Sequence, residues 1–573
     1  MPVVLYGTNV NVTDEIYGPN LPVDMFYPKV INYPYPKPGR ANPVVTLWVA
    51  DLSSPMVGTP KQVTPPKEIQ EWEYYITAVQ WINNSKISVL WTKRSQNITI
   101  LTACAESDGW KCEKLFEEQL HATKGWLEIN EAPHFSEDGS RYFMKLPVAD
   151  GARGTYDHIA MITVDLYSLS QKYFLTHGQF TVIKILAYRS DHNKVYYVAT
   201  SIGQPGERNV YSVTDITDPN PRKIECLSCE ASNDCKYYDA LFSPTKKYYI
   251  LECLGPITPR TELRRVENNE LIAVLNTYPH YDERNEQKAM PKIRYMNVPL
   301  SNNHFARVKL ILPQSLEEDE NAKYPVVVEV NNSPGSQVVS YENTVGWAHY
   351  LASKRDYVVI HMDVRGSGFQ GNKYKHEIYH HLGEYEAEDI VAVMRQQHLS
   401  YIDHDKIAVW GQEFGGYLVT SLLIRDPLFN CGIAVAPVVS WRNYMSAFVE
   451  RYMGMPWQKD NYVNYDKSDL IRNVAAIKDK EFLIVHGTAD RKVNIQHSML
   501  LMKALTEKGV TFKLQLYPDG DHLLHEHKIH FYLAMEDFFS KCFQLEDEQD
   551  EKEVELPITK VIKGGKRIII GEE

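Results

Sequence analysis

The sequence lacks the long apolar stretch of a membrane-spanning helix and the pattern of a signal peptide. No stretch approaches the ~20 consecutive apolar residues of a membrane-spanning helix, and the start, MPVVLYGTNVNVTDE, lacks the basic region and apolar core of a signal peptide. The 61 Lys and Arg residues are outnumbered by 73 Asp and Glu. A net charge of -12 and a pI near 5.9 argue against nucleic-acid binding, which needs a basic face. The remaining composition is that of a soluble globular protein, and 573 residues predict two domains.

Cysteine is also sparse, with eight residues in the whole chain. An even number is typical of disulfides in a secreted protein, whereas CLSC at 226–229 would be half of a metal site in a cytosolic one. No second CxxC completes a zinc ribbon, so we favour disulfides over metal ligation.

Sequons for N-glycosylation occur at Asn11, Asn83, Asn97 and Asn331. A chain of this length would carry about three or four by chance, so their number decides little. We mark Asn11, Asn83 and Asn97 as candidate glycosylation sites.

The serine of a hydrolase is missing from the pattern that should hold it. Residues 407–417 read IAVWGQEFGGY, an apolar run followed by Gly411 and, after a three-residue gap, by Gly415 and Gly416. This is the strand, sharp turn and helix of a nucleophile elbow, G-x-S-x-G, whose glycines allow tight packing. Glu413 occupies the central position. The sequence therefore predicts an α/β-hydrolase scaffold without its serine nucleophile.

A repeat runs through the first half of the chain. An aromatic residue, a polar turn and a β-rich run recur around Trp81, Phe135, Tyr188 and Phe242, at intervals of 53 or 54 residues. This period predicts β-propeller blades rather than a β-sandwich, and one step back reaches MFYPKV, for about four to five blades. Because an incomplete propeller exposes an edge, we expect an N-terminally truncated or alternative product.

From about Met290 strands and helices alternate, which implies a mainly parallel sheet covered on both faces. Expected strands are 307–313, 324–330, 357–363, 406–410, 431–437, 481–487 and 512–518, and expected helices are 384–397 and 494–509. We therefore predict a partial propeller at 1–289, an α/β-hydrolase domain at 290–544 and a charged, disordered tail at 545–573. A docking peptide built on RIII is the alternative for the tail.

Two further residues match a hydrolase triad in order and context. Asp490 ends HGTAD after one expected strand, and His522 follows the next. Glu413 could itself attack, as carboxylate nucleophiles do on this fold, but those are the shorter aspartate. A carboxylate beside His522 would raise the pKa of the imidazole and favour a charge pair over general-base work. We favour a structural role for Asp490 and His522.

Eight stretches in order resemble one family from about residue 20 to 544: INYPYPKPGRANP, CLSCEASNDC, DVRGSGFQG, WGQEFGGY, CGIAVAPVVSW, ERYMGMP, HGTAD and KCFQ. The chain resembles the dipeptidyl peptidase IV family of prolyl oligopeptidase-like proteins. That resemblance implies an eight-bladed propeller over an α/β-hydrolase domain, on a type II membrane protein with its bulk outside the cell. Active members remove dipeptides from N-termini that have proline or alanine second.

Several positions depart from the family's active pattern. Glu413 replaces the serine, Asn331 the oxyanion-hole tyrosine and Lys492 an asparagine. Of two pocket tyrosines, Tyr444 remains and the other is Phe448. The family's paired amine-binding glutamates would lie upstream of this sequence. The pattern looks like the family's non-catalytic branch, which implies an auxiliary subunit of voltage-gated potassium channels. An active serine-type dipeptidyl peptidase or a carboxylate-nucleophile hydrolase is the alternative.

The resemblance also implies disulfides and an extracellular or cell-surface location. The family pairing would be Cys104–Cys112, Cys226–Cys229, Cys235–Cys253 and Cys431–Cys542. No cofactor is expected, and we read His522, His525, His527 and His530 as exposed histidines at a helix start rather than a metal site.

Active relatives dimerise through their last helices and a propeller extension, so a homodimer is expected through 527–543. The alternative is that this segment is buried wholly within its own domain, beneath the propeller and the Cys431–Cys542 link. The apolar residues of this segment exceed one buried stripe. They are Ile529, Phe531, Leu533, Met535, Phe538, Phe539 and Phe543.

Overall fold

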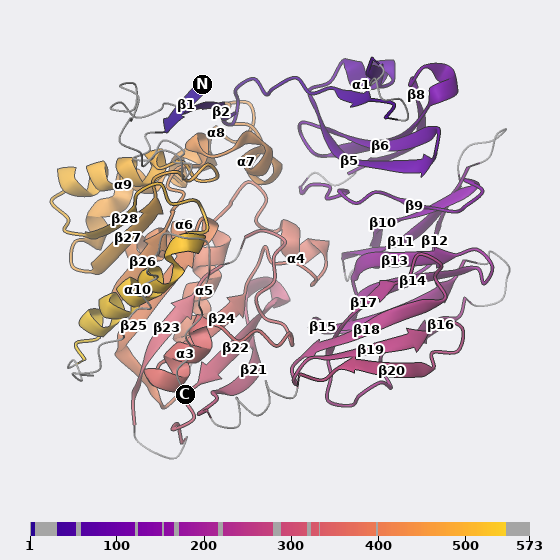
Figure 1. The fold of residues 1–573 in the computed structure, drawn as a ribbon. Helices are drawn as coiled ribbons and strands as arrows, with labels where there is room; N and C mark the ends of the chain where they lie inside the picture. The colour runs from indigo at the N-terminus through magenta and orange to yellow at the C-terminus, as the bar shows by residue number, and fades with distance from the viewer. Residues whose placement is uncertain are drawn as a thin grey trace, which may run out of the picture.

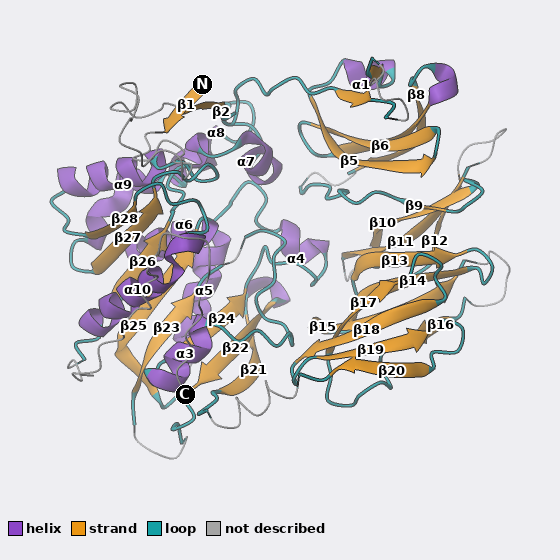
Figure 2. Ribbon diagram, in the orientation of Figure 1, coloured by secondary structure: helices purple, strands orange, loops and turns teal. Residues whose placement is uncertain are grey.

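The computed structural model describes residues 2–5, 31–52, 59–120, 124–151, 154–164, 171–215, 222–278, 288–317, 322–331, 333–396 and 399–545. Asn11, the MFYPKV segment and all but the first residue of the predicted tail lie outside these residues. Figure 1 shows two bodies side by side, one built of strands and one of mixed strands and helices. Figure 2 separates them by secondary structure.

The first body contains four antiparallel four-stranded meanders among the described residues. Their strands are β5 (Tyr74–Asn83), β6 (Lys86–Lys93), β7 (Ile98–Ala105) and β8 (Cys112–Gln119); β9 (His134–Phe135), β10 (Arg141–Ala149), β11 (Thr155–Thr163) and β12 (Gln171–Phe174); β13 (Val182–Arg189), β14 (Lys194–Ser201), β15 (Gln204–Thr214) and β16 (Ile224–Cys226); β17 (Tyr237–Phe242), β18 (Tyr248–Gly255), β19 (Arg260–Arg265) and β20 (Leu271–Asn276). A single parallel pair, Arg208 with Tyr237, joins the last two meanders. A short pair, β3 (Leu47–Val49) and β4 (Lys61–Val63), and helix α1 (Lys67–Gln70) precede them.

The repeat in the sequence corresponds to these meanders. Trp81, Phe135, Tyr188 and Phe242 lie on β5, β9, β13 and β17, the first strand of each. Inner strands such as β6 and β14 are buried on both faces, because neighbouring meanders stack on one another. Phe143 of β10 packs on Tyr188 of the next meander, with ring centroids 4.4 Å apart. The prediction of propeller blades is confirmed.

The second body is an eight-stranded sheet in the order β21-β22-β24-β23-β25-β26-β27-β28. Its strands are β21 (Lys292–Pro299), β22 (Phe305–Leu312), β23 (Tyr324–Glu329), β24 (Val358–Asp363), β25 (Ile402–Gln412), β26 (Cys431–Val435), β27 (Glu481–Gly487) and β28 (Lys513–Tyr517). The pairs β21–β22 and β22–β24 are antiparallel and the others parallel. All seven expected strands are present. Strand β21 was not expected, and β25 begins four residues early.

Helices cover both faces of this sheet. They are α3 (Trp347–Lys354), α4 (Asn372–His376), α5 (Tyr385–Gln396), α6 (Phe414–Arg425), α7 (Ser446–Met453), α8 (Tyr462–Lys467), α9 (Gln496–Glu507) and α10 (Lys528–Cys542). Val326 and Val328 of β23 pack in the core with α5, α6 and α9, whereas Val327 packs with α3 and α10. A strand buried on both sides is typical of a parallel sheet. The α/β-hydrolase prediction is confirmed.

Helix α10 corrects one argument made from the sequence. Five of its supposedly surplus apolar residues are buried in the core of their own domain: Phe531, Met535, Phe538, Phe539 and Phe543. Only Ile529 and Leu533 of that set face solvent, 69% and 58% exposed. The inference of a leftover aromatic surface on this helix is therefore wrong, because the sheet and α3 cover the aromatic rings.

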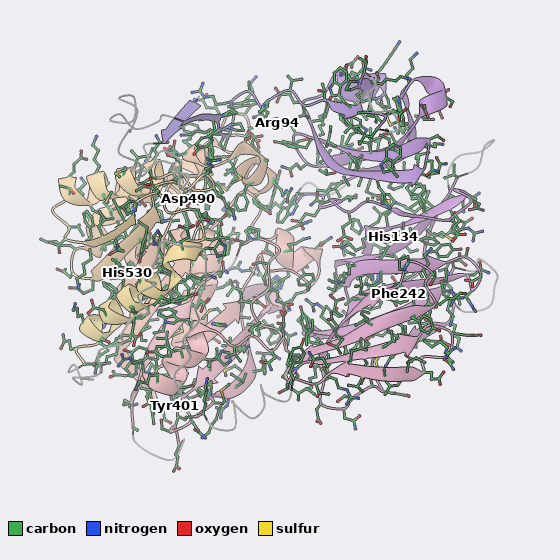
Figure 3. The ribbon with its side chains drawn as sticks, in the orientation of Figure 1. Arg94, His134, Phe242, Tyr401, Asp490 and His530 are labelled. Carbon is green, nitrogen blue, oxygen red and sulfur yellow. A yellow bond between two sulfur atoms is a disulfide. The ribbon has the colours of Figure 1, made fainter. Side chains whose placement is uncertain are left out.

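Charged side chains join the two bodies. Arg94, in the turn after β6, is labelled in Figure 3 between the two bodies. It donates to both carboxylate oxygens of Glu450 on α7 at 2.7 and 2.6 Å. Lys375 of α4 forms a second ion pair with Glu128 at 2.8 Å. The side chain of Glu450 is only 1% exposed. Buried charges need such partners, so these contacts fix the propeller against α7 and α4.

All eight cysteines form disulfides, in the pairing that the resemblance implied. Cys104–Cys112, Cys226–Cys229 and Cys235–Cys253 lie within the propeller part, and Cys431–Cys542 ties β26 to the end of α10. Within the described ranges, no helix combines the length and apolar character needed to cross a membrane. The predicted boundary at residue 289 falls between β20 and β21 and stays a prediction.

Candidate active site with an ionic lock

Glu413 lies at the sharp turn between β25 and α6. Its backbone has φ 58° and ψ -109°, which is strained for a residue other than glycine. The turn packs against the end of β23: a Cβ at Gly411 or Gly415 would meet the carbonyl oxygen of Val330 at 2.3 or 2.1 Å. This approach explains the glycines of the motif. The structure therefore builds the nucleophile elbow and presents a glutamate from it.

The Glu413 carboxylate receives three side-chain donors. Lys492 Nζ lies 2.6 Å from Oε2, and His522 Nε2 lies 3.2 Å from the same oxygen. The Tyr444 hydroxyl donates to Oε1 at 2.7 Å. Both oxygens are thus engaged. We call the four side chains of Glu413, Lys492, His522 and Asp490 the ionic lock.

Asp490 completes the lock behind the histidine. Its Oδ2 lies 2.7 Å from His522 Nδ1, and its Oδ1 accepts the backbone N–H groups of Lys492 and Val493 at 2.8 and 2.9 Å. Asp490 is 1% exposed, so its charge depends on these partners. The structure thus brings together the three triad positions identified in the sequence, from the ends of β25, β27 and β28.

The electrostatics favour a charged pair. Burial alone would raise the pKa of Glu413, but hydrogen bonds from His522, Lys492 and Tyr444 lower it to about 2. Burial alone would lower the pKa of His522, but the hydrogen bonds to Asp490 and Glu413 raise it to about 9. At neutral pH the imidazole is therefore a cation between two carboxylates, with both nitrogens donating.

In this arrangement the side chains at the triad positions are hydrogen-bonded to one another. A general base needs a free imidazole nitrogen, and both nitrogens of His522 lie within hydrogen-bond distance of carboxylate oxygens. A carboxylate nucleophile needs an unengaged oxygen, and both oxygens of Glu413 accept hydrogen bonds. In the state described, the carboxylate of Glu413 and the imidazole of His522 are thus both engaged in ionic contacts.

The other degenerate positions surround the lock. Asn331 follows β23 beside the elbow, with its Cα 3.6 Å from a Cβ built at Gly415, and its side chain is exposed. Tyr444 and Phe448 form an aromatic cluster with Trp441, and their two rings lie 5.3 Å apart. Tyr444 and Phe448 therefore pack together beside the elbow, and the Tyr444 hydroxyl donates to Glu413.

Two features of the site were missed in the sequence. In the sequence, Lys492 stands out only as a departure from the family's asparagine and not as the partner of Glu413. The pairing could have been inferred because the change at Glu413 adds a negative charge and the change at Lys492 adds a positive one. Tyr35, far away in the chain, fixes the loop by donating to the Lys492 carbonyl at 2.7 Å. No local pattern indicates that contact.

The histidines after the triad do not converge. His530 Nδ1 bonds the Tyr517 hydroxyl at 2.9 Å, and the ring of His527 stacks on Tyr517. Within the described parts of the chain, no group of three or more His, Cys, Asp or Glu side chains could hold a metal ion. Asn83 is exposed and Asn97 is half-buried.

A β-propeller part joined to an α/β-hydrolase domain with elbow, acid and histidine defines a prolyl oligopeptidase-like protein whose nucleophile position is a glutamate. Comparison with known proteins agrees. Residues 10–260 match the dipeptidyl peptidase IV N-terminal region, and residues 343–546 match the prolyl oligopeptidase family. The chain therefore belongs to the dipeptidyl peptidase IV family of prolyl oligopeptidases.

One relative named as inactive and one named as a peptidase have the same sequence identity to this chain. The inactive dipeptidyl peptidase 10 of Rattus norvegicus is 36% identical, over 92% of this chain and 66% of its own length. The dipeptidyl peptidase 4 of Sus scrofa is also 36% identical, over 91% of this chain and 68% of its own. A crystal structure of Porphyromonas gingivalis dipeptidyl peptidase 4 shares the fold, with a TM-score of 0.79 at 24% identity over 94% of this chain and 71% of that one.

Proposed function

We propose that this chain is a catalytically silent member of its family that acts by binding other proteins. The observation that carries the proposal is the ionic lock: Glu413 stands at the nucleophile position and is held by Lys492 and His522. Outside the lock, Tyr444 donates to the other oxygen of Glu413. Sequence identity does not decide between silent and active relatives, since both reach 36%. The chemistry of the site therefore carries the proposal.

A fluorophosphonate probe tests silence directly, because it labels only an activated nucleophile. We expect no labelling of the intact protein, with an active serine peptidase of the family as the positive control. Saturable labelling that disappears in Glu413→Gln or His522→Gln would overturn the proposal in favour of a carboxylate-nucleophile hydrolase. Labelling that survives Glu413→Gln would come from a nucleophile elsewhere in the chain and would overturn it too.

We further propose an extracellular or cell-surface location. Four disulfides in one chain favour an oxidising compartment, because cytosolic thiols are kept reduced. Expression in mammalian cells tests this: N-glycans at Asn83 or Asn97 require passage through the secretory pathway. Protein recovered only in the cytosol, without glycans, would contradict it.

For the partner, we propose a voltage-gated potassium channel of the A type, on the resemblance to the non-catalytic branch. The chain spans about two thirds of the length of the curated relatives it matches. Co-expression with such a channel, followed by surface co-precipitation and current recording, tests the pairing. No co-precipitation and unchanged gating would remove the channel as the partner of this chain, while leaving catalytic silence untouched.

We also propose that the chain forms a homodimer through α10. Ile529 and Leu533, at i and i+4, share one face of that helix and are exposed. Sedimentation at micromolar concentration should give a dimer, and Ile529→Glu/Leu533→Glu should give a monomer. A concentration-independent monomer of the unmodified protein would contradict this.

A further inference from the structure

The four disulfides differ in their accessibility. All eight cysteines lie in the described part of the chain, and in three pairs at least one cysteine is buried: Cys104 and Cys431 at 0% exposure and Cys253 at 5%. In the CLSC loop, by contrast, Cys226 is half-buried and Cys229 is exposed. Cys229 is therefore the cysteine of this pair that a soluble thiol can approach without the protein unfolding. Access of this kind separates labile disulfides from structural ones.

The two sulfurs of this pair are not equivalent. The backbone N–H of Cys229 donates to Cys226 Sγ at 3.1 Å. Such a bond stabilises negative charge on the sulfur, and closely spaced CxxC thiols commonly ionise more easily than isolated ones. The neighbouring Glu225 carboxylate is paired with Lys194 and Lys223 at 2.6 and 2.5 Å, so its charge is offset. Cys226 is therefore the sulfur suited to leave when Cys229 is attacked.

The loop is anchored without its disulfide. Leu227 N–H donates to the Val210 carbonyl at 2.8 Å, and Leu227 packs in the blade core. Ser228 is fully buried, with its Oγ accepting from Val210 N–H at 3.0 Å and donating to Asn209 at 2.8 Å. The disulfide closes a separation of only three residues, so it restricts the unfolded chain least of the four. Opening it should leave the blade folded.

We propose that Cys226–Cys229 is a thiol–disulfide exchange site for soluble thiols of the glutathione class. A thiolate attacks Cys229 Sγ, the S–S bond breaks, and Cys226 leaves as a thiolate that takes a proton from water. A second thiolate attacks the external sulfur of the mixed disulfide and releases Cys229. Two external thiols are thereby oxidised to one disulfide, and the protein pair gains two electrons and two protons.

Mild reduction of the folded protein tests the proposal. The intact chain is treated with millimolar reduced glutathione without denaturant, alkylated and mapped by mass spectrometry. We expect Cys226 and Cys229 to be alkylated at least tenfold faster than the other six cysteines, with an unchanged near-UV circular dichroism spectrum. In Cys226→Ser, where Cys229 cannot reclose, oxidised glutathione should give a stable adduct at Cys229.

The double variant Cys226→Ser/Cys229→Ser is the matched control. It should fold, give the same spectrum and show no fast-labelling cysteine. Reduction of another pair at an equal rate, alkylation of no cysteine before denaturant is added, or loss of the near-UV spectrum on labelling would each overturn the proposal.

Discussion

Lys492 Nζ lies 2.6 Å from Glu413 Oε2, so two departures from the active pattern of the family contact one another. Taken separately, one is a lost nucleophile and the other a lost asparagine. Together they form an ion pair of opposite charges at the position where an active relative would start catalysis. The contact gives the altered site a coherent physical role: it holds the loop of Asp490 against the elbow.

Restoring the serine should not restore activity. Glu413→Ser rebuilds a triad with His522 and Asp490. It leaves Lys492 without its carboxylate partner beside the new serine, and Asn331 offers no phenolic hydroxyl to the oxyanion. Loss of one oxyanion donor costs about two to three orders of magnitude in turnover. We expect turnover below ~10⁻² of an active relative. Glu413→Ser/Asn331→Tyr should exceed the single variant, and near-normal turnover in the single variant would refute this account of the other defects.

The lock should make stability depend on pH. Because the pKa of His522 is raised from 6.5 to about 9, its charge adds stability that is full below pH 6.5 and is lost as pH rises through 9. The pKa of Glu413 is lowered from 4.5 to about 2, so its contribution is full above pH 4.5 and is lost as pH falls through 2. We expect the lock to contribute most between pH 4.5 and 6.5.

Thermal unfolding between pH 5.5 and 9.5 measures this. The Tm difference between the unmodified protein and His522→Gln should be largest at the acid end and shrink towards pH 9.5. His525→Gln, an exposed histidine three residues away, is the control and should show no such trend. A difference that grows with pH would contradict a charged His522.

The ion pair between the two bodies should be costly to break from one side. The side chains of Arg94 and Glu450 are 10% and 1% exposed, so Arg94→Met leaves a buried carboxylate without its cation. Breaking such a pair typically costs about 3–5 kcal/mol. Chemical denaturation should register that loss. The double variant Arg94→Met/Glu450→Met should recover part of it, and a single variant as stable as the unmodified protein would show that the contact contributes nothing.

The disulfide Cys431–Cys542 should be the most stabilising of the four. It closes a separation of 111 residues and ties β26 to the end of α10. In the chain-entropy model such a link contributes on the order of 4 kcal/mol, chiefly by restricting the unfolded chain. Cys431→Ser/Cys542→Ser should lower the free energy of unfolding by about that amount, and Cys226→Ser/Cys229→Ser by much less. Equal losses in the two variants would contradict the entropic explanation.

The sequence predicted most of the fold because both parts carry periodic signals. Trp81, Phe135, Tyr188 and Phe242 each lie on the first strand of a meander, so their spacing is the repeat length of one blade. Gly411 and Gly415 mark the close approach of the elbow to β23. Strand β21 gave no such signal. Its sequence is KIRYMNVP, and it lies at an edge of the sheet, where burial on one side imposes little pattern.

The sequence predicted where the site residues lie in the fold, but not which side chains contact one another. The order of Glu413, Asp490 and His522 along the chain located the triad, because each follows a strand of one parallel sheet. The Lys492 contact could not be read from order, since it depends on where a long, flexible side chain points. Likewise, the apolar residues of α10 gave no indication of which would be covered by α3 and the sheet.

Turnover of a fluorogenic Gly-Pro dipeptide substrate by the purified chain tests the central claim most directly. The lock and Tyr444 together engage both oxygens of Glu413, and the lock engages both nitrogens of His522. We therefore predict hydrolysis no faster than that of a matched Glu413→Gln/His522→Gln control. Saturable release of the fluorophore that depends on Glu413 and His522 would contradict catalytic silence.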